Sequence, residues 1–325
     1  MLTSLNIENF RLFKHLEVKD LKRVNLFAGR NNSGKTALLE ALRISAAGED
    51  LSVMRYILQQ RGETTSSGWE MYDSFFYRPI FKNTRSHLND QLRFRINDFR
   101  FERKYLGERN VQYFVGTHEN RQEDVNQLSA TLQHPILPRD KYVYVPFSTS
   151  DYFPLGYYWD QIALTPKEDK VEEILRETIL PNLVRLDVQQ NDRIMVRLHN
   201  EERPIPLKNL GDGAQRMLLI AIGLVLAKDS VLLIDEIETG LHYSVLEKIW
   251  GIIFKYSEEL NVQVFVTTHS QDALRSFMYL LEAPENNENG VFFRLQLNSK
   301  DGQIEAIRYA PESLELSLES NLDPR

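Results

Sequence analysis

The segment best suited to phosphate chemistry is a glycine-bearing loop that ends in a lysine and a threonine. Residues 29–36 read GRNNSGKT and fit the pattern G-x-x-x-x-G-K-[ST]. Backbone N–H groups of such a loop and the positive end of the following helix bind phosphate oxygens, the lysine reaches the β- and γ-phosphates, and the threonine hydroxyl binds Mg²⁺. The predicted nucleotide-binding residues are Gly29, Asn31, Asn32, Ser33, Gly34, Lys35 and Thr36, with Lys35 also a candidate catalytic residue. The alternative is a glycine turn that carries a lysine by chance.

Two neighbouring carboxylates follow an apolar run further along the chain. Residues 231–236 read VLLIDE, a pattern typical of a buried strand that ends in acids. The carboxyl ends of parallel strands open onto the ligand crevice, so Asp235 is predicted to bind Mg²⁺ together with Thr36. Glu236 is predicted to orient or deprotonate the attacking water and is a candidate catalytic residue. The alternative is a strand that leaves the core into an acidic turn.

Two further segments could complete such a site. Leu210, Gly211, Asp212 and Gly213 stand before a helical pattern and form a second turn able to bind an anion. One chain cannot easily direct both glycine turns at a single phosphate, but two copies could. His269 ends another apolar strand and could hydrogen-bond the γ-phosphate or the attacking water. A lone histidine after a strand is more often structural, so His269 is a catalytic candidate only as a member of this set.

These segments are far apart in the chain, and the hydrophobic pattern predicts the scaffold that joins them. The expected strands are 5–7, 16–18, 24–28, 92–105, 111–115, 142–145, 193–198, 205–207, 231–234, 262–267, 291–297 and 304–309; the expected helices start at 36 and at 165, after a capping-box spacing, and cover 214–227 and 244–256. Alternating strands and helices around a glycine-loop strand indicate an α/β fold with a mostly parallel core sheet and an antiparallel β lobe.

The order of these motifs resembles the ATP-binding-cassette (ABC) ATPases of the RecF/SMC kind, and more closely the AAA-type ATP-binding proteins related to the overcoming-lysogenization-defect (OLD) family. The resemblance also includes the N-terminal run 7–11 (IENFR) and the segment 238–242 (ETGLH) after the acids. It implies a P-loop NTPase with an ABC-like head, using ATP and Mg²⁺. It further implies a homodimer or higher oligomer, in which the 210–213 turn of one copy acts as a signature that caps the ATP held by the other.

Under this resemblance residues 1–325 form one ATPase head. Its expected parts are a P-loop lobe (1–50), an antiparallel and helical insertion (51–140), and a lobe with the signature, acid pair and histidine (141–325). The sequence departs from the family at Gly211, where a serine is expected, and at Asp212, where glycine is common, so hydrolysis could be slow. No glutamine follows the 142–145 strand, although a residue of 148–150 could substitute for it.

The remaining candidates depend on charge and aromatic residues. Arg11, with Phe10 and Phe13, could contact the adenine or ribose, although an ordinary apolar strand end explains these residues equally well. The net charge is −7, so DNA binding would need a local basic patch. The candidates for that patch are Arg93, Arg95, Arg100, Arg103, Lys104 and Arg109. The simpler explanation is a meander whose arginines face water and whose aromatics face the core.

Composition limits where the protein acts. With no cysteine, the chain has neither a disulfide framework nor a thiol nucleophile. The longest apolar run, 217–227, is much shorter than the roughly 20 residues of a membrane-spanning helix, and the N-terminus lacks a signal-peptide pattern. We therefore predict a cytoplasmic protein without a membrane partner.

Three hypotheses for function follow. The first is an ATPase that controls a separate effector, such as a nuclease or toxin, in antiphage defence or DNA maintenance. The effector is expected on another polypeptide because the segment after His269 is shorter than a domain of about 100 residues. The second is a RecF-like clamp that grips duplex DNA in response to ATP. The third is a nucleotide-gated scaffold with weak or no hydrolysis.

Overall fold

The computed structural model describes residues 1–47, 51–63, 74–76, 92–97, 99–105, 111–116, 123–124, 142–147, 155–189 and 193–309. The strands are β1 (Ser4–Phe10), β2 (Phe13–Lys19), β3 (Val24–Ala28), β4 (Leu92–Ile96), β5 (Phe99–Tyr105), β6 (Val111–Gly116), β7 (Glu123–Asp124), β8 (Tyr142–Val145), β9 (Leu183–Gln189), β10 (Arg193–Leu198), β11 (Ile205–Pro206), β12 (Val231–Ile234), β13 (Gln263–Thr268), β14 (Gly290–Leu297) and β15 (Ile304–Tyr309). The helices are α1 (Lys35–Ala47), α2 (Leu51–Gln60), α3 (Leu155–Asp160), α4 (Pro166–Thr178), α5 (Asp212–Leu226), α6 (Tyr243–Glu259), α7 (Gln271–Leu281) and α8 (Pro284–Asn287), with a 3-10 turn at Leu207–Leu210.

The central sheet has the strand order β15-β14-β3-β13-β12-β8. Every neighbouring pair in it is parallel except β14 and β15, which form the hairpin expected at residues 291–309. Strands β3 and β13 are buried along their whole length. A parallel sheet covered on both faces needs such continuous apolar strands, which explains the sequence pattern. The predicted α/β fold with a mostly parallel core is confirmed.

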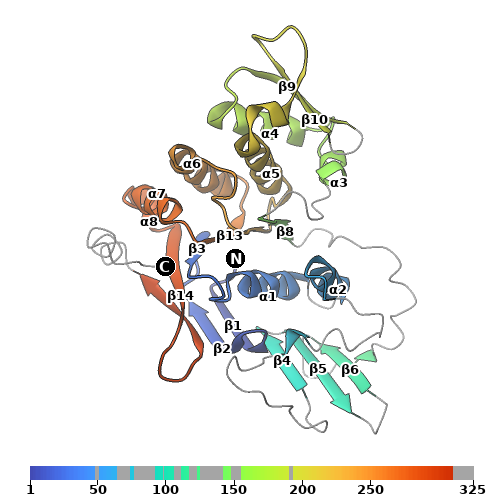
Figure 1. Cartoon of the computed structure of the whole chain (residues 1–325), viewed down its shortest axis with the longest axis vertical. Coiled ribbons are helices and arrows are strands. Elements are labelled where there is room, and N and C mark those ends of the chain that lie inside the picture. Colours follow the sequence, from blue (N-terminus) through green and yellow to red (C-terminus); the bar gives the residue numbers. More distant parts are fainter. Residues whose placement is uncertain are drawn as a thin grey trace.

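The central sheet separates two hydrophobic cores. Leu232 and Ile234 face one core, which is built with helices α4 to α7, whereas Leu233 faces the other, which is built with α1, α2 and the N-terminal strands. Figure 1 shows α5 and α6 on one side of the sheet and α1 on the opposite side. Because successive residues of a strand point to opposite faces, one short apolar run supplies both cores. The loop ends of the central strands therefore lie between these two layers.

A second sheet, entirely antiparallel, has the order β2-β1-β4-β5-β6-β7. This sheet contains the meander predicted for residues 92–115. The N-terminal hairpin of β1 and β2 extends the meander, because Ile7 of β1 pairs with Ile96 of β4. The sheet thus draws strands from both the 1–50 and the 51–140 segments. It packs below α1 in the view of Figure 1.

A third sheet, β11-β10-β9, lies with α3 and α4 at the top of Figure 1. The sequence analysis predicted β10 and β11 but not β9. The buried residues of β9, Leu183 and Leu186, are three positions apart, so the strand does not alternate strictly between buried and exposed residues. Its pairing with β10 has a register irregularity between Arg197 and Leu198. Helix α4 begins as predicted, with Thr165 as N-cap and proline at its first position. Within the described ranges, none of the helices has the length and apolar character needed to cross a bilayer.

Candidate nucleotide-binding site

The phosphate-binding candidate loop connects β3 to α1, as its sequence predicted. Asn32 and Gly34 have positive φ angles of 65° and 96°, and Ser33 N donates to Arg30 O at 3.1 Å. A Cβ at Gly34 would lie 2.8 Å from the Phe13 ring, so both the left-handed backbone and the close contact require glycine. The loop thereby wraps around the N-terminus of α1, where unpaired N–H groups favour an anion.

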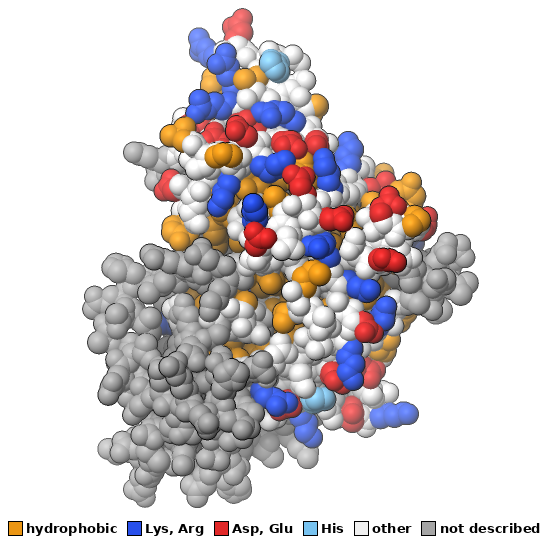
Figure 2. Space-filling view, turned by 180° about the vertical axis from the view of Figure 1, so that it is seen from behind, with side chains coloured by type: hydrophobic (Ala, Val, Ile, Leu, Met, Phe, Trp, Pro, Cys, Tyr) orange, Lys and Arg blue, Asp and Glu red, His pale blue; other side chains and the backbone are white. Residues whose placement is uncertain are grey.

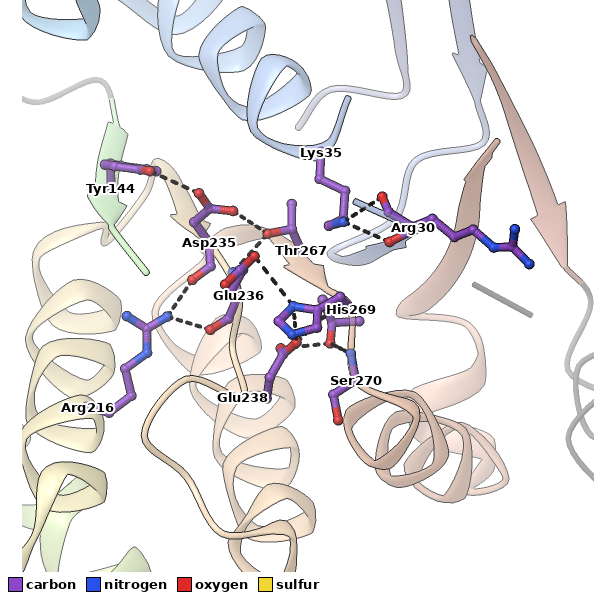
Figure 3. Close-up of polar contacts among 12 residues, drawn as sticks. Arg30, Lys35, Tyr144, Arg216, Asp235, Glu236, Glu238, Thr267, His269 and Ser270 are labelled. Carbon is purple, nitrogen blue, oxygen red and sulfur yellow. Dashed lines mark hydrogen bonds and ion pairs between the residues drawn. The ribbon is translucent and has the colours of Figure 1, made fainter. Parts of the chain in front are cut away.

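Lys35 is folded back onto this loop. Its Nζ donates to the carbonyl oxygens of Gly29 at 2.7 Å and Arg30 at 3.1 Å, as Figure 3 shows. Burial lowers the pKa of Lys35, while the charges of Glu236 and Asp235 oppose that shift. The Ser33 Oγ is buried and has no hydrogen-bond partner among the described residues. A buried ammonium whose hydrogen bonds to described residues go to carbonyl oxygens, beside an unsatisfied hydroxyl, fits the binding of a polyphosphate.

A cleft of about 820 Å³ opens beside the loop. Such a volume is within the range of small-molecule and cofactor sites. Its described walls consist of Arg11, Leu12, Asn31, Asn32, Gly34, Lys35, Thr36, Ala37, Arg61, Ser74, Phe76 and Glu236. The fold therefore brings Glu236 to the same cleft as Lys35 and Thr36, although 200 residues separate them in sequence.

Asp235 lies at the end of β12 with its carboxylate almost completely buried. Thr267 Oγ1 donates to Oδ1 at 2.6 Å and Tyr144 Oη donates to Oδ2 at 3.3 Å. Burial raises the pKa of Asp235, and the two hydroxyl donors oppose that shift. Burial and the Asp235 charge also raise the pKa of Tyr144, so the phenol remains protonated and can donate. A buried carboxylate with lone pairs to spare is a suitable ligand for a hard cation such as Mg²⁺.

Glu236, the second residue after β12, has a left-handed conformation, with φ of 48°. Such a backbone is unfavourable for a non-glycine residue and clusters at functional sites. Its N–H donates to Thr267 Oγ1 at 2.9 Å, which fixes this turn. Burial raises the pKa of the Glu236 carboxyl, with the charge of Asp235 adding to the shift and His269 opposing it. A carboxylate of raised pKa in a cleft has the character of a general base.

His269 follows β13 and lies against two acids. Its Nδ1 is 3.0 Å from Glu238 Oε1 and 3.4 Å from Glu236 Oε1. Glu238 also accepts hydrogen bonds from His269 N at 2.8 Å and from Thr268 Oγ1 at 2.7 Å. Glu238 therefore orients the histidine, a role that the sequence analysis missed. The sequence does show a third acid two residues after Glu236. Nothing in the local pattern indicated that this acid, Glu238, contacts His269.

The signature candidate, residues 210–213, does not contribute to the described walls of this cleft. Gly211 has φ of 95° and ψ of 166°, a region open only to glycine, and a Cβ there would meet no atom of the described residues beyond its chain neighbours within 4 Å. Leu210 is 38% exposed. On its other side the turn packs against Gly240, whose carbonyl oxygen would lie 3.2 Å from a Cβ at Gly213.

Arg216 connects the signature helix α5 to the acids. Its buried guanidinium donates to the carbonyl oxygens of Asp235 at 2.6 Å and Glu236 at 3.1 Å, and also to that of Pro146. Burial lowers the pKa of Arg216 to about 10. Figure 3 shows the side chain reaching from α5 to the end of β12. Any displacement of α5 would therefore act directly on the backbone that carries both carboxylates.

Arg11 lines the cleft, but most of its donors already have protein partners. Its Nε donates to Glu40 at 3.0 Å, and its Nη1 donates to Glu63 at 2.7 Å and to the Ser74 carbonyl at 3.1 Å. The guanidinium carbon lies 4.5 Å from the centre of the Phe75 ring. Only Nη2 is buried without a partner in the part of the chain that the structure describes. A direct contact of Arg11 with a nucleotide remains a prediction.

The proposed basic patch is only partly visible. Arg95 Nη2 forms an ion pair with Glu8 at 2.7 Å, and Ile96 and Phe99 are buried, as the simpler explanation of the meander expects. The side chains of Arg93, Arg100, Arg103, Lys104 and Arg109 lie outside the described part, as do residues 148–150, which were considered as substitutes for a glutamine. On the face seen in Figure 2, acidic and basic side chains are interspersed over the described surface.

The fold and the loop–acid cleft define the class of protein, a P-loop ATPase of the ABC type. Residues 24–276 match the family described as "AAA domain, putative AbiEii toxin, Type IV TA system", and the chain belongs to this family. That match spans every motif from the glycine loop to His269. It confirms the predicted membership of the RecF/SMC group of ABC/AAA-type ATPases, whose fold implies a nucleotide and usually Mg²⁺.

Individual relatives agree with this assignment. The chain is 22% identical to an "ATP/GTP phosphatase" of Helicobacter pylori, over 84% of this chain and 86% of that protein. It is 33% identical over 109 residues to the DNA replication and repair protein RecF of Nitrosococcus oceani, which covers 30% of that protein. Among solved structures it is similar to the SMC head domain from Thermotoga maritima (TM-score 0.53, 15% identity, 95% of this chain and 99% of that one). A second similar structure is an SMC head bound to the C-winged helix domain of ScpA (TM-score 0.58, 14% identity, 98% of this chain and 99% of that one).

Proposed function

We propose that this protein hydrolyses ATP to ADP and phosphate at the cleft beside the glycine loop. The observation that carries the proposal is that Lys35, Thr36 and Glu236, which are about 200 residues apart in sequence, line one cleft of nucleotide size. Lys35 leaves its loop carbonyls to contact the β- and γ-phosphates, and Glu236 accepts a proton from, or orients, the attacking water. His269, held by Glu238, contacts the γ-phosphate or that water.

Thr36 and Asp235 are the residues that would hold Mg²⁺. The metal, when bound, neutralises charge on the β- and γ-phosphate oxygens. Thr36 is the second residue of α1, and Asp235 directly follows β12, the strand next but one to β3. The buried carboxylate of Asp235 and the oxygen-only character of this pair suit a hard cation.

Two copies of the chain form the working unit in this proposal. The signature turn lies outside the described walls of its own cleft, has open space at Gly211 and exposes Leu210. The start of a helix leaves backbone N–H groups without intrahelical acceptors, so the beginning of α5 is suited to a phosphate that a second copy presents. ATP then stabilises the closed dimer and hydrolysis releases it, since the nucleotide binds the closed state more tightly.

The opening and closing of this dimer controls a separate effector in antiphage defence or DNA maintenance. The family description, which names a toxin system, and the similarity to RecF support this part of the proposal. Its test is co-expression with the product of the neighbouring reading frame during phage challenge. Protection that survives both Lys35→Ala and Glu236→Gln would contradict ATP-driven control.

Phosphate release from ATP by the purified chain tests the central claim. We expect turnover that needs Mg²⁺ and rises per chain with protein concentration, because two copies complete each site. Lys35→Ala and Glu236→Gln are expected to abolish it. Turnover that is absent in the wild type, with ATP binding retained, would instead favour the scaffold alternative, which Gly211 in place of a signature serine keeps open.

A RecF-like DNA clamp is the second candidate, favoured by the similarity to RecF over 109 residues. It predicts ATP-dependent binding of duplex DNA that weakens steeply with salt. Replacement of Arg93 and Arg95 by alanine should then reduce the affinity and the salt dependence. Unaltered DNA binding in that variant would exclude the antiparallel sheet as the contact surface.

A further inference from the structure

The carboxylate of Asp235 accepts a hydrogen bond from a hydroxyl on each of the two strands that flank β12. Strands β8 and β13 flank β12, and Val145 and Val266 both pair with Ile234, the residue before Asp235. Tyr144 of β8 donates to Oδ2 at 3.3 Å, and Thr267 of β13 donates to Oδ1 at 2.6 Å. Two donors on different oxygens fix the plane of a carboxylate, because rotation about its Cβ–Cγ bond breaks both bonds.

The Tyr144 ring is itself held in place from the P-loop helix. Arg43 of α1 is buried, and its guanidinium carbon lies 4.3 Å from the centre of the Tyr144 ring. Arg43 Nη1 donates to Gln60 Oε1 at 3.0 Å, and Nε lies 3.4 Å from the Tyr142 hydroxyl. The cation stacked on the ring face restricts the ring, and the ring in turn directs its hydroxyl at Asp235. A continuous set of contacts thus joins α1 and α2 to the acid at the end of β12.

We propose that Tyr144 is a positioning residue for Asp235 and sets the affinity of the site for Mg²⁺. The inference rests on the proposed function, in which Asp235 holds the metal. Partners that orient a ligand carboxylate are worth about 10- to 100-fold in metal affinity or activity. Tyr144 belongs to the strand after which the family resemblance predicted a glutamine, so a different side chain on the same strand approaches the metal-binding acid.

Tyr144 is a cleaner probe than its counterpart on β13. Thr267 Oγ1 donates to Asp235 and also accepts from Glu236 N at 2.9 Å, so its removal would leave a backbone N–H of the neighbouring acid unpaired. Tyr144→Phe removes one oxygen and keeps the ring against Arg43. Tyr142→Phe is the matched control. Tyr142 lies on the same strand and the same face of the sheet as Tyr144, and its hydroxyl accepts from Arg43 Nε, whereas the hydroxyl of Tyr144 donates to Asp235.

The experiment is a Mg²⁺ titration of ATP hydrolysis at saturating ATP, together with ATP binding in EDTA. We expect Tyr144→Phe to raise the Mg²⁺ concentration for half-maximal turnover by about tenfold, with ATP binding in EDTA and the melting temperature close to wild type. Tyr142→Phe should leave the Mg²⁺ dependence unchanged.

Two results would overturn the inference. One is a Tyr144→Phe variant with the wild-type Mg²⁺ dependence; the other is a variant whose turnover falls equally at every Mg²⁺ concentration, which indicates a merely structural role. A wild-type chain without turnover would contradict the proposed hydrolysis instead. In that case the same variants are compared by the increase in ATP affinity that Mg²⁺ produces, which should still be smaller for Tyr144→Phe than for Tyr142→Phe.

Discussion

The acid edge of the central sheet and the signature turn differ in the groups that hold their backbone in place. At the acid edge, Asp235 has two hydroxyl donors, and Arg216 binds the carbonyls of Asp235 and Glu236. At the signature turn, the hydrogen bonds are between backbone groups, with Gly211 N donating to Lys208 O at 3.1 Å and Ala214 N donating to Gly211 O at 3.2 Å. Both regions end in sharp backbone turns with positive φ, at Glu236 and at Gly211. Among the residues that the structure describes, side-chain hydrogen bonds hold the backbone of the acid edge, whereas the N-cap at Gly211 has none.

A single chain thus holds the acid edge in place with its own side chains, whereas the signature turn stays accessible to a ligand. The acids need precise placement before a nucleotide arrives, because preorganised groups act without reorganising during the reaction. The signature turn requires only a free helix N-terminus and room for a ligand. Arg216, on the helix that starts at the signature turn, bonds to the backbone at the acid edge and connects the two regions. Single substitutions should separate the contributions of the two regions.

Replacement of Lys35 by alanine should remove turnover entirely and also weaken ATP binding. Hydrogen bonds to charged groups contribute about 1.5–3 kcal/mol each, so binding should fall by about 10- to 150-fold. The measurement is ATP binding by calorimetry alongside phosphate release. Lys228→Ala, at a surface position outside the described cleft, is the control. Wild-type ATP affinity in Lys35→Ala would contradict the assigned role of the loop.

Glu236→Gln tests the acid edge alone. The amide keeps the shape of the side chain but cannot accept a proton, and loss of a general base costs about 10²- to 10⁴-fold in rate. ATP binding should persist, so that dimers accumulate with ATP and can be detected by size-exclusion chromatography with light scattering. If the variant hydrolyses ATP at the wild-type rate, Glu236 does not act on the attacking water.

Arg216→Met tests the connection between the two regions. The change leaves buried carbonyls without a donor, each at a cost of about 1–3 kcal/mol, so the free energy of unfolding should fall measurably in urea titrations. Arg216→Lys, which keeps one donor, should fall between this variant and the wild type. Equal stability of all three proteins would show that the guanidinium does not hold the acid edge in place.

Gly211→Ala tests the open turn and should have the smallest effect on the isolated chain. A non-glycine residue at this φ costs about 1–3 kcal/mol, while ATP binding to the chain's own cleft should be unchanged. Turnover should fall, because the turn acts on the ATP of a second copy. Gly251→Ala in α6 is the matched control, since it also meets no neighbour but has an ordinary helical backbone. Loss of ATP binding in Gly211→Ala would mean that the turn serves its own cleft.

The sequence predicted the strands of the central sheet, the terminal hairpin and helices α1, α4, α5 and α6 because their patterns are local, but it did not predict α7. It also placed the glycine loop and the acid pair at strand ends, where the structure has them. It missed β9, whose alternation is broken, and it missed the contacts of Tyr144 and Glu238. Tyr144 lies 91 residues from Asp235, and Glu238 lies 30 residues from Thr268, so no spacing rule links these pairs.

Local geometry follows from residues that are close together in the sequence. Glycine at position 34 permits the left-handed turn of the loop, Thr165 caps α4, and continuous apolar runs make buried strands, all through steric and burial effects within a few residues. The tertiary structure decided which side chains meet at the cleft. The strand order β3-β13-β12-β8 sets Val145, Ile234 and Val266 side by side, so the hydroxyls of Tyr144 and Thr267 converge on one carboxylate. Such convergence depends on the pairing of distant strands, which no local pattern encodes.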